Sequence, residues 1–161
     1  MNIINSLKKL EYRGYDSAGL ATLDKDEISE KKCSGRVEEL EKILFKTPSD
    51  GHLGIGHVRW ATHGVPNIVN AHPHSSEIVS VVHNGIIENS DELKKNLESK
   101  GLSFKSQTDT EVITLLITEA LKDSKPLESV FDTLKQLKGS FALGIIFKNY
   151  NNIIKIGRAH V

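Results

Sequence analysis

The chain has 161 residues, of which 38% are hydrophobic and 26% are charged, and these proportions are typical of one globular domain with a core. Its 21 basic and 21 acidic residues balance, which argues against a dominant nucleic-acid or anionic-membrane surface. The single cysteine, Cys33, excludes an internal disulfide, and no apolar run approaches the roughly 20 residues that span a bilayer. We therefore expect a cytoplasmic protein that binds neither nucleic acid nor membrane.

The first third of the chain predicts two helices and three strands. Ile3, Leu7 and Leu10 lie at helical spacing, so the chain is expected to open inside a helix. Turn residues and apolar runs then delimit the following elements. The expected elements are a helix ending near Gly14, strands over 16–24 and 27–33, a helix through 37–44, a loop at 47–51 and a strand over 53–60.

The middle of the chain carries a strong turn signal at Asn84-Gly85. This dipeptide favours a two-residue hairpin turn, because both of its residues tolerate the left-handed backbone conformation. We therefore expect strands over 78–83 and 86–87 to flank the turn.

The last part of the chain predicts three helices followed by two strands. A capping box formed by Thr108 and Glu111 is expected to begin a buried helix, and Pro126 to begin another that ends at Gly139. The expected elements are helices over 90–100, 109–120 and 126–138, a strand over 140–147 and a strand through 153–154. Sheets and helices without strict alternation favour a layered α+β fold.

Both ends of the chain have unusual features. The opening helix has no capping residue before it, so Met1 is interpreted as an internal residue of a longer protein. The last six residues, IGRAHV, match the in-frame translation of a widely used sequencing adapter. We therefore expect residues 156–161 to be a non-native tail that takes no part in the fold.

Three polar segments lie close together in the sequence, among apolar residues typical of strands. They are HVRWATHG (57–64), NAHPH (70–74) and VVHNG (81–85). Polar side chains at this density are costly to bury unless they have partners, so the segments indicate a functional site.

These segments, together with EYRGYDSAG (11–19), VVHNGIIEN (81–89) and TDTEVI (108–113), closely resemble one family. The chain is similar to the N-terminal glutaminase domain, a class II glutamine amidotransferase domain, of the isomerising glutamine–fructose-6-phosphate aminotransferases, or glucosamine-6-phosphate synthases. The resemblance covers about 7–154. It implies the four-layer αββα sandwich of the N-terminal-nucleophile hydrolases, incomplete at both ends. Residues 1–155 would form a partial glutaminase domain, and the family's C-terminal sugar isomerase domains are absent.

The resemblance also implies an activity. The family's glutaminase domain hydrolyses the side-chain amide of L-glutamine, and the ammonia converts fructose 6-phosphate to glucosamine 6-phosphate in the isomerase half. This enzyme is a transferase, needs no cofactor or metal for the glutaminase step, and is expected to form a homo-oligomer at full length. Two alternatives stay open from the residues: a glutamine-binding module without catalysis, and the glutaminase domain of another class II amidotransferase.

The family's nucleophile is an N-terminal cysteine, whose own α-amine acts as its general base. This residue is absent from the chain, whose only cysteine, Cys33, lies mid-chain in an expected strand. A lone cysteine in such a position is usually an inert core residue. We therefore expect the 161-residue chain by itself to be inactive.

The resemblance assigns roles to individual residues. Arg59 would bind the α-carboxylate of glutamine through its planar guanidinium, and Asp109 would bind the α-ammonium. Asn84, through its side-chain amide, and Gly85, through its backbone N–H, would form the oxyanion hole, a role that is compatible with a turn at this dipeptide.

Further residues would line or support this pocket. Trp60 is expected to be a pocket wall, with a core tryptophan as the alternative, and Thr62 and His63 are expected to line the same pocket. Arg13 would lie near the nucleophile and support the loop that closes the site. Six histidines lie between His52 and His83, but they lack the paired spacing of zinc ligands, so we expect no metal site. His72 is instead expected to support the site or the core.

Overall fold

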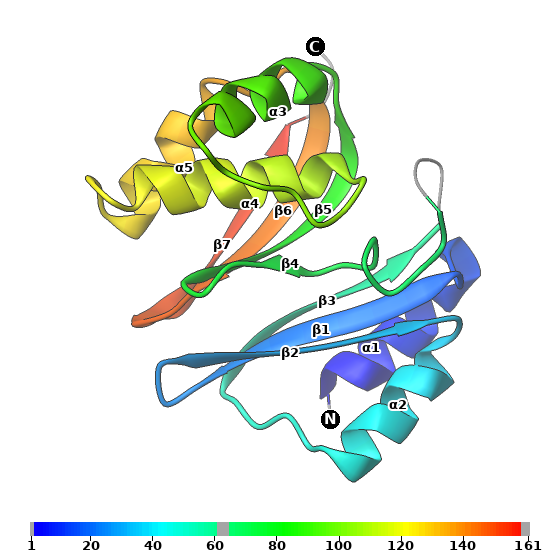
Figure 1. Ribbon diagram of the computed structural model, residues 1–161. Helices are drawn as coiled ribbons and strands as arrows, with labels where there is room; N and C mark the ends of the chain where they lie inside the picture. The colour runs from blue at the N-terminus through cyan, green and yellow to red at the C-terminus, as the bar shows by residue number, and fades with distance from the viewer. Residues whose placement is uncertain (1, 61–64, 159–161) are drawn as a thin grey trace.

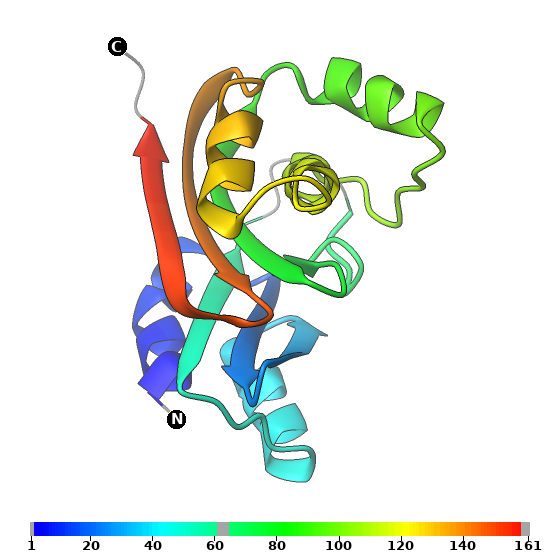
Figure 2. The same ribbon diagram turned by 90° about the vertical axis from the view of Figure 1, so that its left-hand side faces the viewer.

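The computed structural model describes residues 2–60 and 65–158, which form four layers (Figure 1). Two antiparallel sheets face each other, and helices cover the outer face of each. Figure 2 shows the same stacking after a quarter turn. This is the α+β, αββα arrangement that the sequence predicts.

The N-terminal half of the chain forms one sheet and its helical cover. Its elements are α1 (Asn2–Leu10), the 3-10 turn η1 (Glu11–Arg13), β1 (Ser17–Asp24), β2 (Glu27–Ser34), α2 (Val37–Lys46) and β3 (Leu53–Arg59). The strands run antiparallel in the order β2-β1-β3. Helices α1 and α2 pack on the outer face, and the core between them and the sheet contains Ile4, Leu7, Ala18, Leu20, Cys33, Val37 and Leu40.

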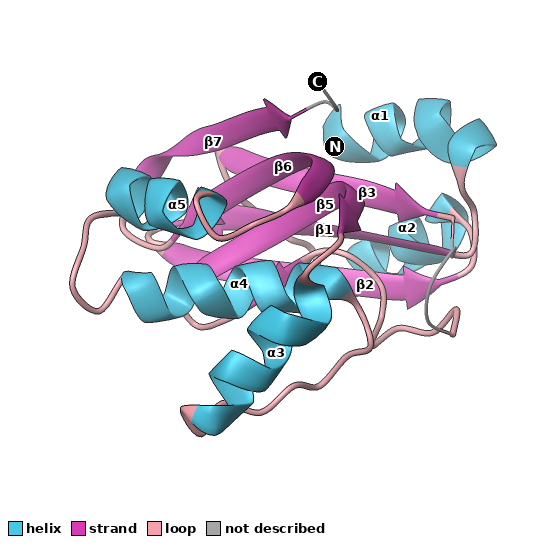
Figure 3. Ribbon diagram, turned by 90° about the horizontal axis from the view of Figure 1, so that it is seen from above, coloured by secondary structure: helices cyan, strands magenta, loops and turns pink. Residues whose placement is uncertain are grey.

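The C-terminal half forms the second sheet and the opposite helical layer. Its elements are β4 (His74–Ser75), β5 (Val79–Ile87), α3 (Ser90–Ser99), α4 (Asp109–Ala120), α5 (Pro126–Leu134), β6 (Gly139–Phe147) and β7 (Tyr150–Arg158). The strands run antiparallel in the order β4-β5-β6-β7. The view from above shows α3, α4 and α5 over this sheet (Figure 3), and the core beneath them includes Val81, Ile87, Ile113, Ile117, Val130 and Phe141.

A third, smaller core joins the two sheets. It contains Ala21 and Leu23 of β1, Ile55 of β3 and Ile146 of β6, with Val82 of β5 packed against it. Because side chains alternate along a strand, these residues identify the face of each strand that points toward the other sheet. On β3 this face carries the odd-numbered residues, and on β5 it carries the even-numbered ones.

The predicted hairpin at Asn84-Gly85 is wrong. Strand β5 runs without interruption from Val79 to Ile87, and the dipeptide pairs with Ala142 and Phe141 of β6. Gly85 has a φ of 139°, so the positive φ that favours a turn in the sequence is used instead within an extended strand. Long-range pairing with β6 overrides the local preference for a turn.

Three further predictions at the ends of elements also need correction, although α4 begins at Asp109 as expected. The capping box is not formed, because Glu111 accepts hydrogen bonds from the backbone N–H groups of Lys105 (2.8 Å) and Ser106 (2.6 Å) instead. Helix α5 ends at Leu134, and Gly139, with a φ of 120°, begins strand β6 rather than capping a helix.

The third of these predictions concerns the start of the expected non-native tail. Strand β7 continues through Ile156 and Gly157, which pair with Leu143 and Ala142 of β6. The expectation that the strand pattern ends at Lys155 is therefore wrong, since alternate residues up to Arg158 stay in register with β6. The non-native origin of residues 156–161 stays a prediction.

One glycine fixes the approach of the segment before β4 to the first sheet. A Cβ atom on Gly19 of β1 would collide with the backbone carbonyl oxygen of His72 and would lie only 3.0 Å from that of Lys31. Both are backbone atoms, so neither can swing away as a side-chain end does. The close contact between β1 and the His72 carbonyl therefore depends on glycine.

We expect Gly19→Ala to lower the free energy of unfolding by about 1–3 kcal/mol, the usual effect of forcing an extra methyl group into a packed interior. Equilibrium urea denaturation measures this change. Gly157→Ala is the matched control, because a Cβ atom there meets no atom within 4 Å. Equal stabilities for the two variants would contradict the expectation.

Candidate active site

Arg59 ends strand β3 on the face that points toward the other sheet. It shares this face with Ile55 and His57, and it is 93% buried, with an exposed fraction of 7%. The backbone of Gly14 lies directly against the peptide bond between Arg59 and Trp60, where a Cβ atom would be 2.6 Å from the Arg59 carbonyl carbon. The chain just after η1 thus supports the end of β3.

Trp60 lies on the surface, with 61% of its area exposed, so the alternative of a core tryptophan is wrong. Its ring is 5.9 Å from that of Tyr15, and the Arg36 guanidinium lies over the Tyr15 ring at 5.1 Å. Arg13 is exposed at the end of η1, one residue before Gly14. These aromatic and basic side chains therefore gather beside the end of β3.

Thr62 and His63 lie outside the described residues. The segment that begins at Val65 is held against Gln107 by hydrogen bonds of the Asn70 and Gln107 amides. Asn70 donates from Nδ2 to the Val65 carbonyl (3.0 Å) and to Gln107 Oε1 (3.2 Å), and the Gln107 N–H donates to Asn70 Oδ1 (2.9 Å). Gln107 gave no signal in the sequence, because an isolated glutamine belongs to no motif.

Asn84 and Gly85 lie near the end of β5 and are exposed, as is the following Ile86. Asn84 is two residues after Val82, so by strand alternation its side chain is on the face toward the first sheet, the face that Arg59 approaches from the other side. Gly85 cannot be replaced without strain, since its φ is 139° and a Cβ atom would collide with the Ser140 carbonyl oxygen.

Asp109, the first residue of α4, reaches strand β5 on both sides of this dipeptide. Its Oδ2 accepts a hydrogen bond from the Ile87 N–H (2.9 Å), and its Oδ1 lies 3.5 Å from His83 Nδ1. The position at a helix N-terminus also favours the negative charge. The carboxylate keeps 25% of its side-chain area exposed, so it is held firmly yet remains accessible.

Three buried histidines, His72, His74 and His83, and the half-buried His57 surround these residues, and we call these four the histidine cluster. The His57 and His72 ring centroids are 4.4 Å apart, and those of His72 and His74 are 5.1 Å apart. His72 thus lies within the core, close to the predicted pocket residues rather than remote from them. Sequence reasoning predicted its supporting position but did not identify its partner.

That partner is Thr110. Its hydroxyl Oγ1 lies 2.8 Å from His72 Nε2, 3.0 Å from His83 Nδ1 and 3.5 Å from Asp109 Oδ1. Thr108 makes the equivalent contact with His74, between Oγ1 and Nε2 at 2.9 Å. The two threonines of the TDT segment therefore bind three histidines, and no sequence pattern singled out Thr110.

Three members of the histidine cluster, His57, His72 and His74, are largely uncharged at neutral pH. Burial lowers the pKa of His57 to about 4, and the charges of His83 and Arg59 act in the same direction, while a hydrogen bond to the His83 backbone acts against them. Burial also lowers the pKa of His74 to about 4 and holds the pKa of His72 well below its ordinary value. Arg59 contributes to the lowered pKa of His72 and His74, so its charge is felt throughout the cluster.

Cys33 does not belong to this site. It lies in β2 within the core beneath α1 and α2, and its exposed fraction is 4%. Burial raises the pKa of its thiol, which disfavours the reactive thiolate. Its environment is that of a structural residue, as the sequence predicts.

Within residues 2–60 and 65–158, no cluster of three histidine, cysteine or acidic side chains is arranged to hold a metal ion. Among the helices of these residues, none is long and apolar enough to cross a membrane.

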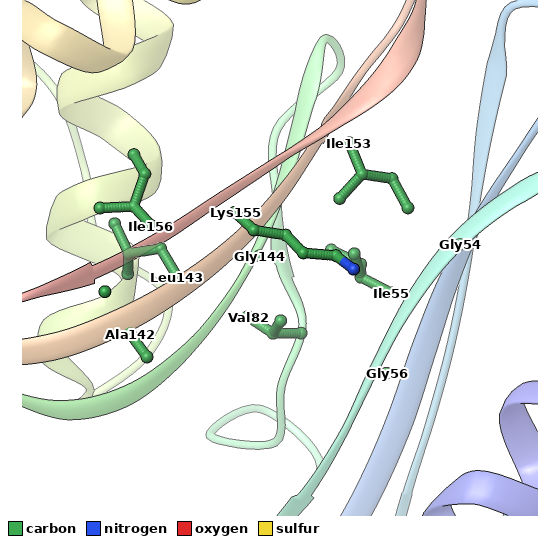
Figure 4. A pocket seen from close by; sticks show the side chains of 11 residues that line it. Gly54, Ile55, Gly56, Val82, Ala142, Leu143, Gly144, Ile153, Lys155 and Ile156 are labelled. Atoms are coloured by element: carbon green, nitrogen blue, oxygen red, sulfur yellow. The ribbon is translucent and has the colours of Figure 1, made fainter.

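An open groove of about 570 Å³ runs along the side of the molecule between β3 and strands β6 and β7 (Figure 4). Its walls are mostly small or aliphatic, including Gly54, Gly56, Val82 and Ile153. It shares no lining residue with the predicted pocket. The groove is therefore a separate feature of the space between the sheets.

Comparisons with known proteins agree with this geometry. The family model described as "Glutamine amidotransferase domain" matches residues 59–160, which is more than half of the chain. The chain belongs to the glutamine amidotransferase domain family. Sequence relatives include glutamine–fructose-6-phosphate aminotransferases [isomerizing] from Mesorhizobium japonicum (52% identity) and Bradyrhizobium diazoefficiens (50%). Each match covers 94% of this amidotransferase chain and 25% of the relative, so the chain spans about a quarter of the length of these relatives.

Two solved structures extend the likeness to the fold of the amidotransferase domain. One is the glutamine phosphoribosylpyrophosphate amidotransferase of B. subtilis complexed with ADP and GMP, with a TM-score of 0.75, 29% identity, and coverage of 91% of this chain and 32% of that chain. The other is described as an allosteric regulatory enzyme of purine biosynthesis, with a TM-score of 0.78, 29% identity, and coverage of 90% and 32%. The predicted N-terminal-nucleophile hydrolase fold is confirmed.

We expect the amidotransferase domain to lose stability as the pH falls from 6.5 toward 4. The unfolded chain binds protons on its histidines in this range, while folded His57 and His74 stay neutral, so protonation favours unfolding. At pH 5 the loss amounts to about 2 kcal/mol for each of these two groups.

Urea denaturation at pH 7.5 and at pH 5 measures this loss. His74→Gln keeps a polar atom near Thr108 and removes the titration, so it should reduce the difference between the two pH values by about 2 kcal/mol. His52→Gln, which removes an exposed imidazole, is the control. A His74→Gln variant with the same pH dependence as the unmodified chain would contradict the expectation.

Proposed function

We propose that this domain binds L-glutamine and, when joined to a cysteine nucleophile, hydrolyses its side-chain amide to release ammonia. One observation carries the proposal. The Asp109 carboxylate is attached to strand β5 at His83 and Ile87, on both sides of Asn84 and Gly85. A group suited to an ammonium ion and two candidate donors to an oxyanion are thereby held in one rigid unit.

Glutamine recognition would use opposite charges at its two ends. Arg59, buried on the inner face of β3, offers a planar fork of N–H donors that fits a carboxylate. Asp109, partly exposed at the start of α4, offers oxygen acceptors to the α-ammonium. A glutamine residue within a protein has neither of these charged groups, so a pocket that binds both would select free glutamine. Trp60, Thr62 and His63 would complete the pocket wall, and Arg13 and His72 would support it.

Asn84 and Gly85 would stabilise the reaction intermediate. Acyl transfer passes through a tetrahedral intermediate with a negatively charged oxygen, and two preorganised donors lower its energy. The Asn84 side chain is exposed on the inner face of β5, and the Gly85 backbone has a φ of 139°, outside the range of a regular strand. Both features support these donor roles.

The activity of a whole protein that contains this domain is also a proposal. By analogy with the names of its relatives, the ammonia would aminate fructose 6-phosphate in a C-terminal isomerase half, and such a protein would be a transferase. A homo-oligomer and a cytoplasmic location stay predictions. No observation on the described residues favours the reading as a non-catalytic binding module.

We expect the 161-residue chain to bind L-glutamine without releasing ammonia, because Cys33, its one cysteine, is a core residue. Asp109→Asn should weaken glutamine binding roughly tenfold to a hundredfold, the usual effect of losing a charge-assisted hydrogen bond. It should leave the affinity for 4-carbamoylbutanoate, which is glutamine without its α-amine, unchanged. Isothermal titration calorimetry with both ligands measures these effects.

Arg59→Lys provides the converse measurement. We expect a loss of similar size for glutamine and no loss for 4-aminobutanamide, which lacks the carboxylate that Arg59 would bind. Asp123→Asn, in the turn after α4, makes the same change of charge as Asp109→Asn and serves as the control. If the unmodified chain does not bind glutamine, or if Asp123→Asn has the same effect as Asp109→Asn, the proposal is wrong.

The oxyanion role needs a form of the protein that carries an N-terminal cysteine nucleophile. In that form we expect Asn84→Ala to lower kcat for glutamine hydrolysis by roughly a hundredfold to a thousandfold with little change in KM, because the donor acts on the intermediate and not on the bound substrate. Coupled glutamate release measures both constants. A change confined to KM would assign Asn84 to substrate binding instead.

A further inference from the structure

Thr110 is a buried hydroxyl at the junction of three elements. It follows Asp109 at the start of α4, its exposed fraction is 0%, and its Oγ1 contacts His72, from the segment before β4, and His83 of β5. The glutamine chemistry proposed above assigns it no role. A fully buried hydroxyl in contact with two imidazoles and close to a carboxylate calls for an explanation beyond packing.

The protons of this network follow from what each group can donate or accept. The Asp109 carboxylate is only an acceptor, and His83 Nδ1 lies 3.5 Å from its Oδ1 and 3.0 Å from Thr110 Oγ1. Nδ1 faces two oxygens, so it carries the proton and His83 is the donor. Thr110 then accepts from His83, its Oγ1 donates to Asp109 Oδ1 at 3.5 Å, and His72 Nε2 lies 2.8 Å from the same Oγ1. The result is a chain of hydrogen-bond contacts that joins His72, Thr110 and His83 to the Asp109 carboxylate.

This chain fixes the ring of His83, and His83 in turn faces the carboxylate of Asp109. The same carboxylate is held at its other oxygen by the Ile87 N–H. The backbone of His83 also receives a hydrogen bond from the His57 ring, which comes from β3 in the opposite sheet. His83 thus links the strand that ends at Arg59 to the start of α4.

We propose that Thr110 and His83 are positioning residues for glutamine recognition, which orient the Asp109 carboxylate toward the α-ammonium of the substrate. The inference rests on the proposed function, because it assigns the ammonium to Asp109. Neither residue touches the substrate. Both act by holding the carboxylate in one orientation, so their loss affects only ligands that carry an α-ammonium.

The experiment measures the affinity of the 161-residue chain for L-glutamine and for 4-carbamoylbutanoate by calorimetry. Thr110→Val has nearly the same shape and removes the hydroxyl, so we expect glutamine to bind at least fivefold more weakly and 4-carbamoylbutanoate to bind as before. Thr110→Ser keeps the hydroxyl and should restore glutamine binding to within twofold of the unmodified chain. A purely structural defect would instead weaken both ligands equally.

A pair of substitutions at His83 supplies an independent test. The amide nitrogen of asparagine can occupy the place of Nδ1, whereas that of glutamine reaches the place of Nε2. We therefore expect His83→Asn to retain most of the discrimination between the two ligands and His83→Gln to lose it. The double variant Thr110→Val/Asp109→Asn should bind glutamine no more weakly than Asp109→Asn alone, since both changes remove one interaction.

The outcomes separate this inference from the proposed function. If the unmodified chain does not prefer glutamine to 4-carbamoylbutanoate, or if Asp109→Asn leaves that preference intact, the assignment of Asp109 fails and the inference fails with it. If Asp109→Asn abolishes the preference but Thr110→Val and His83→Gln leave it unchanged, the proposed function stands and the positioning role is overturned. Additive losses in the double variant would overturn it as well.

Discussion

The structure depends on the burial of imidazole rings whose nitrogen atoms need hydrogen-bond partners. The histidine cluster lies where β3, the segment before β4, β5 and the start of α4 meet, and water cannot satisfy its nitrogen atoms there as it does on a surface. The hydroxyls of Thr108 and Thr110 provide hydrogen bonds without adding charge. Thr108, just before α4, and Thr110 within it thereby dock the helix against β4 and β5 and determine where Asp109 begins it.

The rest of the site follows from that docking. Once α4 is fixed, Asp109 is within reach of the β5 backbone at Ile87, and the exposed pair Asn84 and Gly85 lies between its two attachment points. Arg59 approaches the same region from the other sheet, and Gly14 supports the peptide bond that follows it. A polar site is assembled between two sheets that also share an apolar core containing Leu23 and Ile146.

The sequence predicted the elements whose signal is periodic or compositional. The strand that ends at Arg59 and helix α4 are examples. Each has a buried side, and its apolar residues therefore recur at a regular spacing that can be recognised in the sequence. The polar motifs also contain three histidines, His57, His72 and His74, whose rings the structure brings together. Long-range pairing was beyond this reasoning, as Asn84-Gly85 in an uninterrupted strand shows, and so was the two-residue strand β4, which is too short to carry a pattern. Thr110 was missed because its partners are 27 and 38 residues away along the chain.

Gly85 has a consequence for engineering this domain toward other amides. Its backbone conformation and its contact with the Ser140 carbonyl leave no room for a side chain, so random mutagenesis at this position samples only misfolded or strained variants. Asn84 has no such restriction, because its side chain is exposed and its backbone is that of an ordinary strand. The two adjacent residues share one proposed role but differ in their tolerance of substitution. Any adaptation of the reaction at this dipeptide must therefore change Asn84 and keep Gly85.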